Sequence, residues 1–92
     1  MNYIVTNHVQ ERFVERFCHK FKHELRTTHP ARIIQSLLQE AQPDASIFNT
    51  KKGLKIMEKY ADQRTTFMRN GHIVFVMSGT GNTIKAVTCY EW

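Results

Sequence analysis

The sequence predicts one α+β domain with the element order β-α-α-β-β-β-β, in which two helices pack on one face of a mostly antiparallel sheet. Three observations lead to this fold class. The chain has 92 residues, which suffices for one core but not for two. Apolar residues recur every three or four positions in its first half, as in amphipathic helices. The second half alternates short apolar segments with turn residues, which favours strands.

The first half of the chain is predicted to hold a short strand and two helices. Residues 3–6 are aromatic or β-branched and favour a strand, and Thr6-Asn7 offers an N-cap for the next helix. A second helix begins at Pro30, a favoured first-turn residue, and ends before Pro43. The first helix is long, residues 8–26, because its apolar residues are four apart: Val9, Phe13, Phe17, Phe21 and Leu25.

The second half is predicted to form four strands, at residues 54–60, 64–69, 72–77 and 83–90. Asn70-Gly71 is the strongest short signal for a hairpin, and the strand after it is apolar on both faces, as in the middle of a sheet. A two-residue turn there would pair Arg69 with His72, Phe67 with Val74, and Thr65 with Val76. Residues 78–82 would form a second turn, whereas residues 45–53 show no decisive pattern. The sheet face opposite the helices would be only partly covered, and a ligand is expected there.

Charge and composition narrow the function classes. Thirteen Lys and Arg oppose eight Asp and Glu, and the net charge of +5 favours a polyanionic partner, nucleic acid above all. No segment has the roughly 20 apolar residues of a membrane span, and the start lacks the features of a signal peptide. We therefore expect a cytoplasmic protein with no membrane partner. Its two cysteines, Cys18 and Cys89, are expected to be reduced and buried.

The long predicted helix carries a cationic face opposite its phenylalanines. At 100° per residue, two arginines and three histidines share an arc of about 80°, namely His8, Arg12, Arg16, His19 and His23. Lys20 and Arg26 lie near this arc. Charges on the solvent side of a surface helix are common, so the face fits a solvated surface as well as a binding site.

The composition of this face favours phosphate chemistry. Arginine binds phosphate through its planar fork, and histidine titrates near neutral pH. Metal-free cleavage of RNA needs a group that deprotonates the 2′-hydroxyl, a cation that stabilises the phosphorane, and an acid that protonates the leaving 5′-oxygen. Arginine and histidine together can supply these roles.

Other residues could extend this site or replace it. Lys51 and Lys52 form a minor basic patch that fits a phosphate contact as well as a solvated surface. His19 and His23 have the i, i+4 spacing of zinc ligands, but the HExxH motif and a third ligand are missing, so no metal and no cofactor are expected. Four residues of the predicted strands could join a site on a sheet face: Tyr60, Arg64, Thr88 and Tyr90.

Three segments resemble a known group of ribonucleases. Residues 3–8 followed by Arg12 and Arg16, the hairpin at residues 69–76, and the closing segment at residues 84–90 are similar to BrnT-like and RelE-type domains of the barnase-EndoU-colicin-RelE superfamily. The resemblance implies the β-α-α-β-β-β-β plan and a metal-independent ribonuclease, commonly a toxin that an antitoxin neutralises. It assigns His8 and Arg12 through the opening motif and Thr88 through the closing one, with Arg16 and Tyr90 as additions.

Two function hypotheses follow from the sequence. In the first, the chain is a toxin-like endoribonuclease with His8, Arg12, Thr88 and Tyr90 as catalytic residues and RNA as its partner. The remaining basic residues would then bind RNA: Arg16, His19, Lys20, His23, Arg26, Lys51, Lys52 and Arg64. In the second, the chain is a non-catalytic phage or bacterial protein that inhibits or regulates a host protein through the same basic helix. A DNA-binding module is a third option, for which no helix-turn-helix signature is present.

Overall fold

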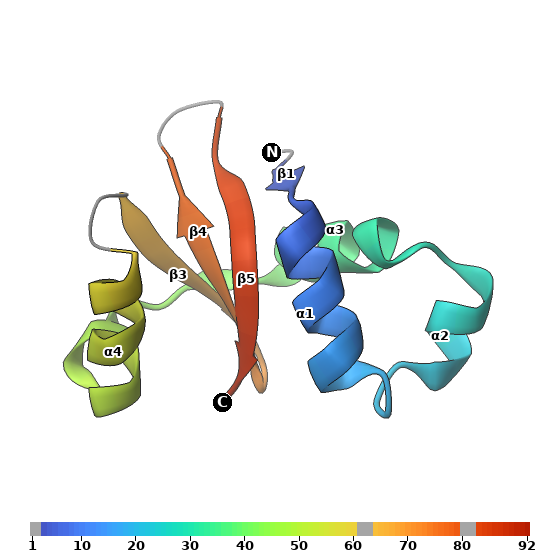
Figure 1. Cartoon of the computed structure of the whole chain (residues 1–92), viewed down its shortest axis with the longest axis horizontal. Helices are drawn as coiled ribbons and strands as arrows, with labels where there is room; N and C mark the ends of the chain where they lie inside the picture. The colour runs from blue at the N-terminus through green and yellow to red at the C-terminus, as the bar shows by residue number, and fades with distance from the viewer. Residues whose placement is uncertain (1–2, 61–63, 80–82) are drawn as a thin grey trace.

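The computed structural model describes residues 3–60, 64–79 and 83–92 and confirms the α+β class (Figure 1). A five-stranded sheet has the strand order β1-β5-β4-β3-β2, and every pair is antiparallel except β1 with β5. The elements in chain order are β1 (Ile4–Val5), α1 (Asn7–Phe17), α2 (Lys22–Thr27), α3 (Pro30–Glu40), β2 (Gln42–Pro43), the 3-10 helix η1 (Ala45–Asn49), α4 (Lys51–Lys59), β3 (Thr65–Asn70), β4 (Ile73–Ser78) and β5 (Lys85–Glu91). No helix among the described residues is long and apolar enough to cross a membrane.

Helices α1 and α3 pack on one face of the sheet, as predicted. Thr6 caps α1 by accepting a hydrogen bond from the Val9 amide at 3.2 Å. One stripe of α1 is then fully buried against β4 and β5: Val9, Phe13 and Phe17. α3 begins at Pro30 and adds Ile34 and Leu38 to the same core. The core formed by α1, α3 and this sheet face fixes α1 beside β5. It thereby also fixes the position of the solvent-facing side of α1.

The single long helix predicted over residues 8–26 is wrong, because the chain breaks between α1 and α2. The amides of Lys20 and Phe21 both bond to the Phe17 carbonyl, which closes a turn. The break lets Phe21 fold back onto Phe13, with ring centroids 5.2 Å apart. In an unbroken helix, residues eight apart lie about 12 Å apart along the axis. Tertiary packing of the phenylalanines therefore overrides the continuous helical pattern.

The predicted strand at residues 54–60 is also wrong, since most of this segment belongs to α4. Thr50 caps the helix by accepting a hydrogen bond from the Gly53 amide at 2.9 Å. Gly53 and Ile56 are buried, whereas Leu54 is 52% exposed. Burial thus follows a spacing of three and not the alternation that predicted a strand.

The hairpin after residue 70 is confirmed, but its register differs from the prediction by two residues. Asn70 pairs with Ile73 and Phe67 with Val76, so Gly71 and His72 form the turn. A type I′ turn centred on Asn70-Gly71 would need positive φ at both residues. Gly71 has a φ of +58°, and none of the described non-glycine residues has a positive φ. A glycine in the first turn position is what a type II′ turn requires.

The second sheet face is covered by η1 and α4, and the cover is incomplete near β5. Five residues form the second core: Ile47, Ile56, Phe67, Val74 and Val76. β4 is therefore buried on both faces in the middle of the sheet, as its sequence predicted. Tyr60, Tyr90 and Trp92 pack against this core but stay partly exposed. Of the predicted second turn, residues 80–82 lie outside the described part of the chain.

The two cysteines are expected to differ sharply in reactivity. Both are free; Cys89 is fully buried and Cys18 is exposed, which corrects the expectation that both are buried. Burial raises the pKa of the Cys89 thiol to about 12, although Arg16 opposes this rise. Since the thiolate is the reactive form, a thiol reagent at neutral pH should modify one cysteine in the folded protein and two in denaturant. Cys18→Ser should leave no fast-reacting thiol, and two fast thiols in the folded wild type would contradict this arrangement.

Candidate functional site

The candidate site lies where one edge of β5 is not paired with any strand of the described residues. β1 pairs with Lys85 and Ala86, and no strand among the described residues continues this pairing further along β5. Arg16 from α1 occupies the vacant edge, where its Nη1 donates a 2.6 Å hydrogen bond to the Cys89 carbonyl. The guanidinium carbon also lies 4.6 Å from the centre of the Tyr90 ring. Arg16 thus reaches from the α1 side of the sheet to a residue that packs on the opposite face.

Tyr60 joins this arrangement from the end of α4. It follows the last helical residue, and its amide bonds to the Ile56 and Met57 carbonyls. Its phenol lies close to the side chains of Thr88, which is 1% exposed, and of Tyr90. Partial burial and Tyr90 raise the pKa of Tyr60, while the nearby arginines and the Thr88 hydroxyl oppose the rise. Tyr60 therefore remains a protonated phenol at neutral pH.

His8, Arg12 and Arg16 lie on successive turns of α1, as the helical spacing predicted. His8 is partly buried in the first turn. Arg12 donates a 2.6 Å hydrogen bond to Glu15, which together with the Glu15 charge raises the pKa of Arg12. Arg12 and Arg16 are close enough to Tyr60 to lower its pKa. We call His8, Arg12, Arg16, Tyr60 and Tyr90 the β5-edge surface.

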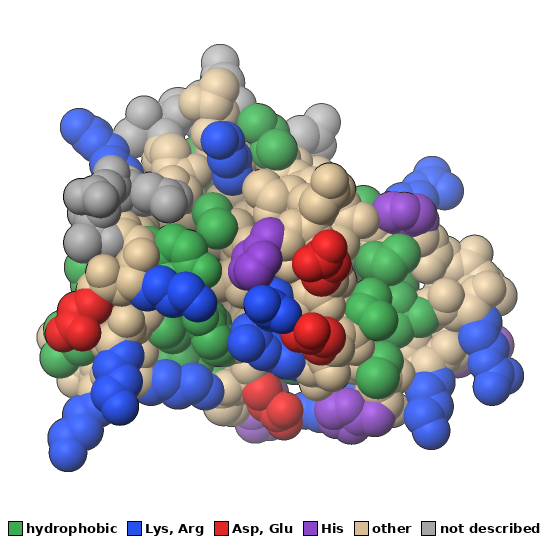
Figure 2. Space-filling view, in the orientation of Figure 1, with side chains coloured by type: hydrophobic (Ala, Val, Ile, Leu, Met, Phe, Trp, Pro, Cys, Tyr) green, Lys and Arg blue, Asp and Glu red, His purple; other side chains and the backbone are tan. Residues whose placement is uncertain are grey.

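A second cation–aromatic pair lies further along β5. Lys52 from α4 donates a hydrogen bond to the Glu91 carbonyl, and its Nζ lies 4.6 Å from the centre of the Trp92 ring. The Glu91 carboxylate forms a 3.1 Å ion pair with Lys20, whose hydrogen bond lowers the pKa of Glu91. Figure 2 shows hydrophobic side chains exposed between α4 and α1, with Lys and Arg side chains on both sides of them. Cationic and aromatic groups therefore share this part of the surface.

Other predicted site residues lie apart from the β5-edge surface. His23 and Arg26 are exposed on α2, beyond the break, and His19 lies in the turn before it. Lys51 and Arg64 are exposed at the start of α4 and just before β3. Because the helix breaks, His19 and His23 do not share a helix face. No three His, Cys, Asp or Glu side chains of the described residues group as metal ligands would.

Two residues of the site are not among the predicted catalytic and RNA-binding residues: Trp92, and Tyr60, which the sequence indicated only as a strand residue that could join a site. Tyr60 was assigned to a strand, and its approach to Thr88 depends on where α4 packs, which no local pattern reveals. Trp92 had a detectable signal, since Thr88, Tyr90 and Trp92 alternate along one strand direction and so share a face. Thr88 itself is buried, so it contacts Tyr60 and not a ligand in solvent.

A cavity of about 810 Å³ lies elsewhere, between α2 and α3. Phe21, Leu37 and Gln35 are among its lining residues, together with Glu24 and Arg32. None of the residues of the β5-edge surface lines it. The cavity and the cationic surface are therefore separate features of the molecule.

Comparison with known proteins gives no relative from which a function can be transferred. No family model, no curated protein and no solved structure matches this chain.

Proposed function

We propose that this chain is a small endoribonuclease that cleaves RNA without a metal, by attack of a 2′-hydroxyl on the adjacent phosphate. The observation that carries the proposal is the position of Arg16. Its guanidinium is held at the open edge of β5 by the Cys89 carbonyl and the Tyr90 ring. It lies near the protonated phenol of Tyr60 and on the same helix face as His8 and Arg12. The α1 face and the adjoining β5 edge thus offer a cation, a proton donor and an imidazole that can act as a base.

The three steps of the reaction divide among these groups. His8 accepts the proton of the 2′-hydroxyl, and the 2′-oxygen forms its bond to phosphorus. Arg16 and Arg12 stabilise the negative charge of the phosphorane. The bond from phosphorus to the 5′-oxygen then breaks, and Tyr60 donates its proton to that oxygen. The products are a 2′,3′-cyclic phosphate and a 5′-hydroxyl.

Two further residues position this machinery. Tyr90 holds the Arg16 guanidinium against its ring, and the buried Thr88 hydroxyl orients the Tyr60 phenol. The resemblance of the opening and closing segments to BrnT-like and RelE-type domains supports His8 and Arg12 as catalytic residues and Thr88 as a member of the same site. A toxin that acts in the cytoplasm and is neutralised by an antitoxin is the biological form that this resemblance favours.

The proposal is tested by incubating the purified protein with total RNA in the presence of EDTA. We expect cleavage with 2′,3′-cyclic phosphate ends, and a strong loss of rate in His8→Ala. His23→Ala is the matched control, because His23 is exposed on α2, away from the β5-edge surface. This variant should cleave RNA at the wild-type rate. Intact RNA with the wild-type protein would overturn the proposal. RNA that is bound but not cleaved would instead favour a non-catalytic protein that docks an acidic partner on α1.

Replacing Glu15 by glutamine should strengthen RNA binding by a few-fold. The change removes the carboxylate that holds Arg12 and leaves the guanidinium fork free for phosphate. Glu11→Gln is the matched control, since it changes net charge equally without breaking this hydrogen bond. Affinity is measured by fluorescence anisotropy of a labelled oligonucleotide that cannot be cleaved. Equal effects of the two substitutions would show that Arg12 makes no specific phosphate contact.

A further inference from the structure

Trp92 directly follows β5 and packs on the same core as Tyr90, and each of the two rings has a cation over it. Side chains two residues apart on a strand point the same way, about 6.6 Å apart along its axis. The Arg16 guanidinium carbon and the Lys52 amine each lie 4.6 Å from the centre of their ring. The chain thus presents two aromatic rings in series, each next to a positive charge.

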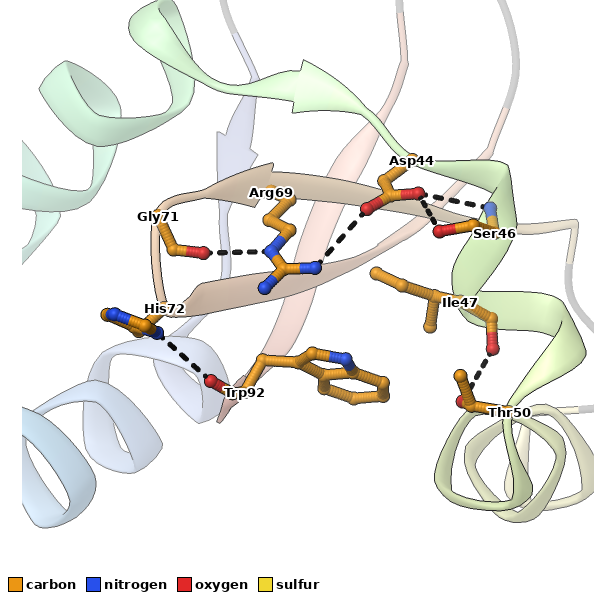
Figure 3. Close-up of polar contacts among 8 residues, drawn as sticks. All are labelled: Asp44, Ser46, Ile47, Thr50, Arg69, Gly71, His72 and Trp92. Carbon is orange, nitrogen blue, oxygen red and sulfur yellow. Dashed lines mark hydrogen bonds and ion pairs between the residues drawn. The ribbon is translucent and has the colours of Figure 1, made fainter.

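The backbone of Trp92 is held in place by the β3–β4 hairpin (Figure 3). Its amide donates to the His72 carbonyl at 2.8 Å, and His72 Nδ1 lies 3.2 Å from the Trp92 carbonyl oxygen. The hairpin is itself braced, because Arg69 donates to the Gly71 carbonyl at 2.8 Å and lies 3.6 Å from Asp44. A ring held by such a frame loses little conformational freedom when a ligand binds.

The Trp92 indole differs from a purely structural core residue in two respects, its exposure and the cation beside it. Trp92 packs on the second core and remains partly exposed. The cation over it belongs to Lys52, an exposed residue whose amine donates to the Glu91 carbonyl and has two further N–H donors for a phosphate. Proteins that bind single-stranded nucleic acid combine these two elements, aromatic rings for the bases and cations for the backbone.

We infer that Trp92 and Lys52 form a nucleobase-stacking subsite next to the phosphate position at Arg16, so that the substrate is single-stranded RNA. The inference rests on the proposed function. An extended strand that placed a phosphate on Arg16 would carry an adjacent base past Tyr90 to the Trp92 ring. A duplex cannot offer that base face, because its bases are stacked within the helix.

The chain contains one tryptophan, so its fluorescence reports directly on this subsite. The probe is a short oligonucleotide with 2′-O-methyl groups, which cannot undergo cleavage by 2′-oxygen attack. We expect this oligonucleotide to quench the tryptophan emission, whereas the same backbone without bases and a duplex of the same sequence should not. Binding is followed in parallel by anisotropy of a labelled oligonucleotide.

Variants separate stacking from charge. Trp92→Leu should weaken binding about 5- to 150-fold, the range that 1–3 kcal/mol of stacking per base implies, and Trp92→Phe should restore part of the affinity. Binding of the wild type by anisotropy without quenching would overturn the subsite and leave the proposed ribonuclease standing. Equal quenching by the backbone without bases would overturn it as well. If no nucleic acid is bound at all, the proposed function fails together with the subsite.

Discussion

Replacing Arg16 by lysine is expected to lower the rate of RNA cleavage by about 10²- to 10³-fold, the usual cost of removing one group that stabilises a transition state. The Arg16 fork can donate to the Cys89 carbonyl and to a phosphate at once, because guanidinium carries five N–H donors in a plane. A lysine amine is a compact charge that cannot hold both positions in the same geometry. Because lysine keeps the positive charge, the loss of cleavage rate would measure the contribution of the guanidinium geometry and not that of the charge.

The rate is measured with a labelled single-stranded RNA, and the fold is followed by circular dichroism. Arg26→Lys is the matched control, since Arg26 is exposed on α2 and lies apart from the β5-edge surface. It should cleave at the wild-type rate. A wild-type rate in Arg16→Lys would remove the guanidinium from the proposed mechanism.

Replacing Gly53 by alanine is expected to destabilise the protein by about 1–3 kcal/mol, the typical cost of overpacking. A Cβ at this position would lie 1.9 Å from the Ile47 carbonyl oxygen and 2.9 Å from Thr50 Oγ1. The first of these atoms belongs to the backbone of η1, so α4 and η1 must move apart. The usual preference of a helix for alanine, about 1 kcal/mol over glycine, is outweighed by this clash.

Thermal unfolding tests this expectation, since each kcal/mol lowers the Tm of a domain of this size by roughly 4–8 °C. Leu54→Ala is the matched control, because the neighbouring Leu54 is 52% exposed and its truncation should change Tm little. Activity should fall as well in Gly53→Ala, because α4 carries Lys52 and is followed by Tyr60. A Tm equal to or above that of the wild type would show that η1 can move away from the added Cβ without loss of stability.

Predictions from the sequence succeeded where the determining interactions are local. The α1 face with His8, Arg12 and Arg16 follows from helical spacing, and the bounds of α3 follow from Pro30 at its start and Pro43 beyond its end. The hairpin was located by Asn70-Gly71, although its register depended on the positive φ at Gly71. Each of these features is decided within a few residues of the chain.

The errors occurred where distant packing decides the structure. The break after Phe17 brings Phe21 back to Phe13, and helix α4 forms because Gly53 and Ile56 face η1. The same holds for the site, where Tyr60 meets Thr88 through the docking of α4. Helical periodicity placed the cations on α1, but no sequence pattern placed the tyrosine opposite them.

The parallel pairing of β1 with β5 also determines when the site can exist during synthesis of the chain. Thr6 bonds to the Ala86 carbonyl across 80 positions, and Arg16 bonds to Cys89 across 73. While a ribosome is still making β5, the cations of α1 have already been synthesised, but the strand edge and Tyr90 have not. Contacts between such distant segments form late because of the loop entropy that they cost. A nascent chain would therefore carry the charges of this surface without its assembled geometry until the last strand emerges.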